Sequence, residues 1–157
     1  MSSREVGQRN LSPTALGRHA GDSVSSMASD VWTRYEQVGE DDRSSLTKQE
    51  RAAFAICDLR QEVNSGGFDS YFRYWGGDTA SEALGALPEV LGHDWASLLR
   101  EAMQTLGPVY PSDADDRADV LDQRQLDERL NELDSRFYEL EASADADQRV
   151  NAYLARG

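Results

Sequence analysis

Apolar residues recur at steps of three and four along most of this chain, and no segment shows the alternation with period two of a half-buried strand. Isoleucine, which favours strands, occurs once. The length of 157 residues is usual for one domain. The pattern therefore predicts an all-α fold, a single compact domain of about six or seven helices formed by residues 23–157.

Residues 1–22 are expected to form a flexible arm. The segment contains Ser-Pro, isolated glycines and few large apolar residues, so ordering it would cost conformational entropy with little burial in return. Its charge is slightly basic, with Arg4, Arg9 and Arg18 against Glu5 and Asp22, whereas the rest of the chain is acidic.

Capping signals predict where the central helix begins and ends. Thr47 and Glu50 have the spacing of a capping box, in which each side chain accepts a hydrogen bond from the backbone of the other residue. The helix is expected to end at residues 64–67, where glycine can adopt a left-handed stop. A short helix with one aromatic face, better explained as core than as a platform for stacked bases, should follow.

Similar signals divide the second half of the chain. Thr79 and Glu82 have the spacing of a second capping box, and Pro88 should kink or divide the helix behind it. Asp94 is expected to cap the next helix. The remaining expected segments are a helix at 24–38, an extended acidic connection at 111–119, the longest helix at 126–140 and a last helix at 150–154.

The charge balance limits the classes of partner. Lys and Arg total 16 and Asp and Glu total 29, a net charge of −13, which disfavours direct binding to nucleic acid or to an anionic membrane. It is compatible with a basic protein partner, although a proteome that is acidic throughout would give the same balance. No apolar run approaches the length of a membrane span and the N-terminus lacks a signal-peptide core, so a cytoplasmic location is expected.

Candidates for catalysis are few. His93 beside Asp94 has the residue types of a general base pair, but a polar residue in an interhelical turn is the better explanation. Cys57, the single cysteine, lies in an apolar stretch and is better explained as a small buried thiol than as a nucleophile. No Glu-x-x-His motif or phosphate-binding loop is present. The sequence therefore predicts a protein without enzymatic activity, cofactor or metal.

The acidic residues are the remaining candidates for a binding surface, the alternative being a solvated face that only confers solubility. They form three groups. These are Glu40, Asp41 and Asp42; then Asp113, Asp115, Asp116 and Asp119, expected in an exposed loop; and then Asp127, Asp134 and Glu141, which repeat every seven residues along one expected helix.

Residues 62–72 read Glu-Val-Asn-Ser-Gly-Gly-Phe-Asp-Ser-Tyr-Phe. This segment resembles the signature of the bacterial DNA-mimic protein domain family, small acidic all-helical proteins in which Glu-Val-Asn-Asn-Gly-Gly-Phe precedes a short aromatic helix. Ser65 departs from that pattern. The similarity extends over residues 23–153 and is strongest over 50–106. The residues that carry it, expected to shape the turn and fill the core, are Asn64, Gly66, Gly67, Phe68, Tyr71 and Phe72.

The resemblance implies an inhibitor, acting as a dimer, that presents DNA-like charge to a basic DNA-binding protein, either a regulator or an architectural protein, and blocks its DNA site. Two other classes stay open from the residues alone. One is an immunity- or antitoxin-like protein that binds through an apolar-centred interface. The other is a small hydrolase that uses His93 or the acids.

Overall fold

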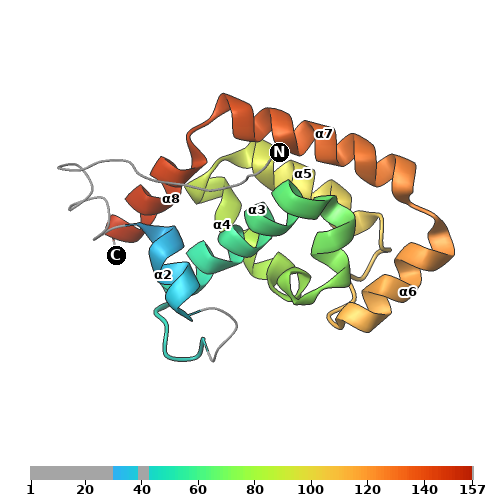
Figure 1. Ribbon diagram of the computed structural model, residues 1–157, viewed down its shortest axis with the longest axis horizontal. Helices are drawn as coiled ribbons and strands as arrows, with labels where there is room; N and C mark the ends of the chain where they lie inside the picture. Colours follow the sequence, from blue (N-terminus) through green and yellow to red (C-terminus); the bar gives the residue numbers. More distant parts are fainter. Residues whose placement is uncertain (1–29, 39–42, 157) are drawn as a thin grey trace, which may run out of the picture.

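Helix α3 (Lys48–Arg73) runs through the middle of the computed structural model, which describes residues 30–38 and 43–156 (Figure 1). Helices α2, α4, α6, α7 and α8 all pack against it. Those residues contain no strand, and the predicted all-α class is confirmed. The other elements are α2 (Val31–Val38), the 3₁₀ helix η1 (Trp75–Thr79), α4 (Ala80–Val90), α5 (His93–Gln104), α6 (Ala114–Arg124), α7 (Asp127–Ser143) and α8 (Ala146–Ala155).

The core lies where α3, α5 and α7 meet, and aromatic rings fill much of it. Phe137 on α7 contacts Phe68 on α3 edge to face, with ring centroids 5.9 Å apart, and contacts Trp95 on α5 at 5.3 Å. Phe68 also stacks on Phe72 at 5.9 Å. Phe68, Tyr71 and Phe72 are fully buried, so the aromatic face is part of the core, as the sequence indicates.

The first capping box is confirmed. The Thr47 hydroxyl accepts from the backbone N–H of Glu50 at 3.0 Å, and the Glu50 carboxylate accepts from the N–H of Thr47 at 3.0 Å. Both bonds join residues three apart, so local sequence is enough to specify them.

The expected break in the helix at residues 64–67 is confirmed, because a kink at Gly67 separates the two helical segments that together make up α3. Gly67 adopts φ 79° and ψ 178°, and helical geometry resumes at Phe68. Gly66 does not have a positive φ, so the residue that needs glycine for backbone reasons is Gly67. With the segment beyond the kink included, α3 is longer than α7, contrary to the expectation that α7 is the longest helix.

Two local predictions are wrong in detail, and one of the two alternatives for Pro88 is excluded. The Thr79 hydroxyl makes no cap bond, and it donates instead to the buried carboxylate of Asp58 at 2.8 Å. Helix α5 begins at His93 after Gly92, so Asp94 lies in its first turn rather than at its cap. Pro88 lies inside α4 without dividing it. Pro88 has no backbone N–H to donate, but α4 ends only two residues later, at Val90, so little of the helix lies beyond the lost hydrogen bond.

The acidic connection predicted at 111–119 is also wrong, because α6 begins at Ala114. Asp115 and Asp116 lie in its first turn, where negative charge favours the helix dipole, and Arg117 and Leu121 are buried one turn apart. The predicted arm at 1–22, the start of the predicted helix at 24–38 and the acids Glu40, Asp41 and Asp42 lie outside the described residues.

Candidate partner-binding surface

The exposed acids of α6 are the most open carboxylates that the sequence singled out. Asp113 precedes the helix as its N-cap residue, and Asp115, Asp116 and Asp119 lie on it. All four are exposed, and none of their carboxylates has a hydrogen bond or ion pair with any residue in 30–38 or 43–156. Their charge is therefore not neutralised by the part of the fold that the structure describes.

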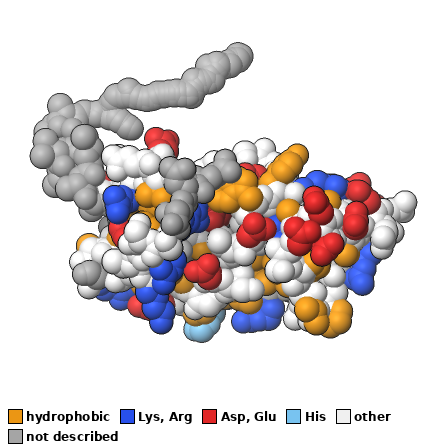
Figure 2. All heavy atoms as spheres, turned by 90° about the horizontal axis from the view of Figure 1, so that it is seen from below, with side chains coloured by type: hydrophobic (Ala, Val, Ile, Leu, Met, Phe, Trp, Pro, Cys, Tyr) orange, Lys and Arg blue, Asp and Glu red, His pale blue; other side chains and the backbone are white. Residues whose placement is uncertain are grey.

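The end of α3 adds further acids beside α6. Arg73 donates to Asp69, one turn earlier on α3, at 2.8 Å and to Asp122 on α6 at 2.8 Å. One arginine thus joins two helices and leaves an excess of negative charge at their contact. Figure 2 views the molecule from the lower side of Figure 1 and shows Asp and Glu side chains gathered on the half where α6 lies.

Helix α6 is held in place by Arg117, whose side chain is fully buried. Its guanidinium donates five hydrogen bonds: to the carbonyls of Phe72, Tyr74, Pro111 and Ser112 and to the carboxylate of Asp78, at 2.7 to 3.1 Å. A planar guanidinium offers five N–H donors in a fixed geometry, whereas a lysine ammonium offers three. We call this arrangement the Arg117 clamp. It fixes α6 against the end of α3 and η1.

The acids that repeat every seven residues on α7 are not one free row. Asp134 accepts from the backbone N–H of Phe68 at 2.8 Å. Glu141 accepts from Arg60 at 2.7 and 2.9 Å and from Asn64 at 3.0 Å. Both therefore hold α7 against α3. Asp127 is exposed and has no such bond to a described residue.

A buried carboxylate that sequence reasoning missed is Asp58, whose side chain is fully enclosed. It accepts from the Tyr35 hydroxyl at 2.6 Å, from Arg43 at 2.9 and 3.1 Å and from Thr79 at 2.8 Å. These four bonds join α2, α3 and η1 and satisfy the charge. The signal available in the sequence was the position of Asp58 inside the apolar run 52–59. An acid in such a run is buried only when it is paired, so this position indicates a paired, buried carboxylate.

The candidate catalytic residues do not meet in one place. Cys57 is fully buried, and burial raises the pKa of its thiol, which opposes a thiolate nucleophile. His93 is exposed at the start of α5. Among the described residues no group of three or more His, Cys, Asp or Glu could hold a metal ion.

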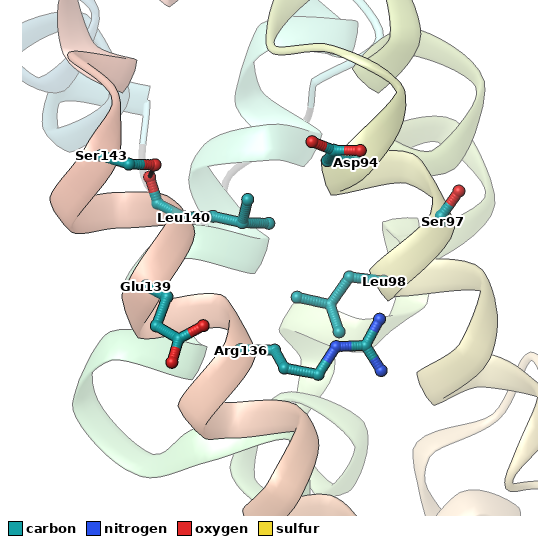
Figure 3. Close-up of a pocket in the computed structure, with 7 residues that line it drawn as sticks. All are labelled: Asp94, Ser97, Leu98, Arg136, Glu139, Leu140 and Ser143. Atoms are coloured by element: carbon teal, nitrogen blue, oxygen red, sulfur yellow. Dashed lines mark hydrogen bonds between the residues drawn. The ribbon is translucent and has the colours of Figure 1, made fainter.

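The groove between α5 and α7 is a shallow cavity of about 420 Å³ (Figure 3). Its lining contains two serines but neither histidine nor cysteine, and Arg136 extends from it to the carboxylate of Glu101 at 2.7 Å. The Ser143 hydroxyl donates to the backbone carbonyl of Leu140 at 3.1 Å rather than to a carboxylate. The lining residues are Asp94, Ser97, Leu98, Arg136, Glu139, Leu140 and Ser143.

Fold and surface define an acidic all-α protein whose unpaired aspartates gather beside one helix. The chain belongs to the DMP19-like protein family, whose model matches residues 44–157, and this is a family of DNA mimic proteins. The resemblance indicated by residues 62–72 is thereby confirmed. Comparison with curated proteins and with solved structures gives no match. Among the described residues no helix combines the length and the apolar character that a membrane crossing needs.

Proposed function

We propose that this chain binds a basic DNA-binding protein, a regulator or an architectural protein, in place of DNA and so blocks its DNA site. The observation that supports this best is the set of unpaired aspartates on α6. Its four members, Asp113, Asp115, Asp116 and Asp119, lie within seven residues. At ~1.5 Å of rise per residue that is about one carboxylate per 3 Å, close to the ~3.4 Å between phosphates along one DNA strand.

Electrostatics favours such a partner at long range. A net charge of −13 repels phosphates and attracts the Lys and Arg side chains that contact them. Carboxylates without intramolecular partners lose no ion pair when a partner's arginine or lysine arrives. The function requires binding alone, without a catalytic step or cofactor, and it would operate in the cytoplasm, where the DNA is. A homodimer would double the charge on offer.

The predicted site residues contribute unequally to this proposal. Asp113, Asp115, Asp116 and Asp119 come first because their charges are exposed and unpaired, and Asp127 comes next for the same reason. Glu40, Asp41 and Asp42 remain candidates because of their charge in the sequence alone. Asp134 and Glu141 act through the fold, since their hydrogen bonds hold α7 against α3.

The test compares the wild-type chain with an α6 variant that carries Asp113→Asn, Asp115→Asn, Asp116→Asn and Asp119→Asn. Each is immobilised and exposed to DNA-binding proteins purified from an extract of the native host on a DNA matrix. The wild-type chain should retain at least one of them, and duplex DNA should release it. Retention should weaken steeply with salt, and the α6 variant should show a smaller salt slope.

A control variant removes the same charge elsewhere, with Gln in place of the exposed residues Glu36, Glu82, Glu128 and Glu139. It should retain the partner nearly as well as wild type. Equal binding by the α6 variant, or no protein released by duplex DNA, would reject the proposal. A complex insensitive to both salt and DNA would instead favour the immunity-like class, whose interface is apolar at its centre.

A further inference from the structure

Large apolar side chains are exposed on two segments next to α6. Val109, in the connection between α5 and α6, is 80% exposed, and Tyr74 and Trp75, at the end of α3 and the start of η1, are 57% and 38% exposed. We call these three residues the Tyr74 patch. Single exposed apolar residues are common on protein surfaces, so the relation between the two segments decides whether they matter together.

The Arg117 clamp fixes the two segments side by side. One terminal nitrogen of its guanidinium donates to the carbonyl of Tyr74 at 3.0 Å, and the other donates to the carbonyl of Pro111 at 3.1 Å. The hydroxyl of Tyr110 adds a 2.6 Å bond to the carbonyl of Gly77. The backbone on both sides is therefore anchored, and the apolar side chains are presented at low cost in conformational entropy.

Trp75 is anchored from a different direction. The guanidinium of Arg43 lies 5.4 Å from the centroid of its ring, and the same guanidinium donates to the buried carboxylate of Asp58 at 2.9 Å. Arg43 thus links the indole at the surface to the buried network around Asp58. Rigid aromatic residues in such settings are the ones that commonly dominate binding energy at interfaces.

Acids border the Tyr74 patch. Asp78 follows Trp75 in η1, and its carboxylate is half exposed although it accepts from Arg117. Asp113 lies four residues after Val109 and is unpaired among the described residues. In Figure 2 hydrophobic side chains lie on both sides of the acidic group on this half of the molecule. Apolar and acidic groups therefore alternate on one face.

This alternation matches the surface that proteins use to read DNA. Such surfaces place Arg and Lys on phosphates and apolar side chains on thymine methyl groups or between base steps. We propose that the Tyr74 patch contacts the apolar, base-reading side chains of the basic protein that the α6 aspartates attract, so that the carboxylates replace phosphates and the patch replaces base methyls. This inference rests on the proposed function. It adds an apolar contact that would let the chain select one basic protein among others.

Charge argues against a second copy of the chain on this patch. The acids beside the Tyr74 patch would face their equivalents across a symmetric contact, so this face is unfavourable for a homodimer. A basic partner would instead meet these acids with opposite charge. We therefore expect such a partner to cover the Tyr74 patch.

The test uses two synthetic basic helical peptides of about 20 residues with identical arginines. The first carries Leu and Phe between the arginines, and the second carries Ala at those positions. The full-length wild-type chain should bind the first about tenfold more tightly, a difference of about 1.4 kcal/mol. A variant with Tyr74→Ala and Val109→Ser should bind both peptides equally and keep the wild-type salt slope.

Two controls keep the outcomes separate. Tyr138→Ala removes an exposed tyrosine ring on α7, outside the patch, and should keep the tenfold preference. The α6 variant should bind both peptides more weakly, by the same factor, and with a smaller salt slope. If its binding is unchanged, the proposed function fails. The ratio of the two peptide affinities still tests the patch in that case. Equal binding of the two peptides by the wild-type chain overturns the inference. So does a wild-type dimer, seen by sedimentation, that the Tyr74→Ala and Val109→Ser changes dissociate.

Discussion

The carboxylate of Asp134 on α7 accepts a 2.8 Å hydrogen bond from the backbone N–H of Phe68 on α3. Gly67, directly before Phe68, has non-helical angles, so helical geometry resumes without the usual acceptor one turn earlier. An acid 66 residues further along the chain supplies that acceptor. The kink in α3 and the position of α7 therefore depend on each other.

Asp134→Ala should lower the free energy of unfolding by about 1–3 kcal/mol, because it leaves the Phe68 N–H without a partner in a partly buried place. Urea unfolding at neutral pH measures the loss. Asp127→Ala is the matched control, since its carboxylate is exposed and makes no such bond to a described residue. It should change stability by less than about 0.5 kcal/mol. Equal losses in the two variants would contradict the capping role.

The same carboxyl should give a defined pH dependence. Burial raises the pKa of Asp134 above the value it has in the unfolded chain. Its protonated form is therefore favoured by folding, and that contribution is present below the unfolded pKa and is lost as pH rises through the folded pKa. Asp134→Asn cannot ionise, so its stability relative to wild type should increase from about pH 3 to about pH 6. Urea unfolding at a series of pH values measures this difference in free energy of unfolding. A difference that stays constant or decreases as pH rises would contradict the prediction.

Gly67→Ala should be strongly destabilising, by about 2–4 kcal/mol. Its backbone angles are accessible almost only to glycine, and a Cβ would collide with the Asp134 carboxylate. Gly85→Ala is the control, because that glycine lies inside α4 and an added Cβ would meet nothing within 4 Å. It should stabilise the protein by about 0.5–1 kcal/mol through the greater helix propensity of alanine. Thermal unfolding separates the opposite signs.

Local signals predicted what local contacts determine. The Thr47 capping box formed because both of its partners lie within three residues of each other. The Thr79 box has the same spacing, yet its hydroxyl donates to Asp58, 21 residues earlier in the chain. The helical period gave the all-α class for a similar reason, since it depends on neighbours one turn away.

Which charged residues are buried, and which acids are paired, depends on tertiary contacts. The spacing of residues in the sequence gives no information about those contacts. Arg117 lies between aspartates and acidic turns, a setting typical of a solvated residue, but its acceptors include the carbonyls of Phe72 and Tyr74, which lie 45 and 43 residues earlier in the chain. Asp127, Asp134 and Glu141 share one spacing, and only the partners on α3 separate the last two from the first. The acids with no partner within the described fold are the ones that the candidate surface retains.

Tyr71→Phe should raise the free energy of unfolding by about 1 kcal/mol. The ring is fully buried, and its hydroxyl has no hydrogen-bond partner among the residues that the structure describes, so removing the oxygen removes a desolvation cost. Tyr35→Phe is the matched change at a satisfied hydroxyl and should cost about 1.5–3 kcal/mol, because it takes one donor from the charged Asp58. Denaturant midpoints of the two variants should move in opposite directions. Destabilisation by both would show that the Tyr71 hydroxyl is bonded in solution.

Arg117→Met should cost about 3 kcal/mol or more, because a buried acceptor left without its donor costs about 1–3 kcal/mol and several carbonyls lose theirs. Five acceptors lose their donor, and the half-exposed Asp78 loses its cation. Gly77 shows how closely the clamp is built, because a Cβ there would lie 3.2 Å from the Arg117 guanidinium. Arg100→Met is the control, since Arg100 is exposed on α5 and has no ion pair with a described residue. It should change stability by less than about 0.5 kcal/mol.

Hydrogen exchange of the Arg117→Met variant tests whether the clamp positions the acidic surface as well as stabilising the fold. Because Arg117 joins α6 to the end of α3 and to η1, the amides of residues 114–124 should lose more protection than those of α7, which Asp134 and Glu141 hold independently. A uniform loss along the chain would assign Arg117 to global stability alone. A loss confined to α6, with weaker partner binding although every aspartate remains, would show that the position of the carboxylates matters in addition to their number.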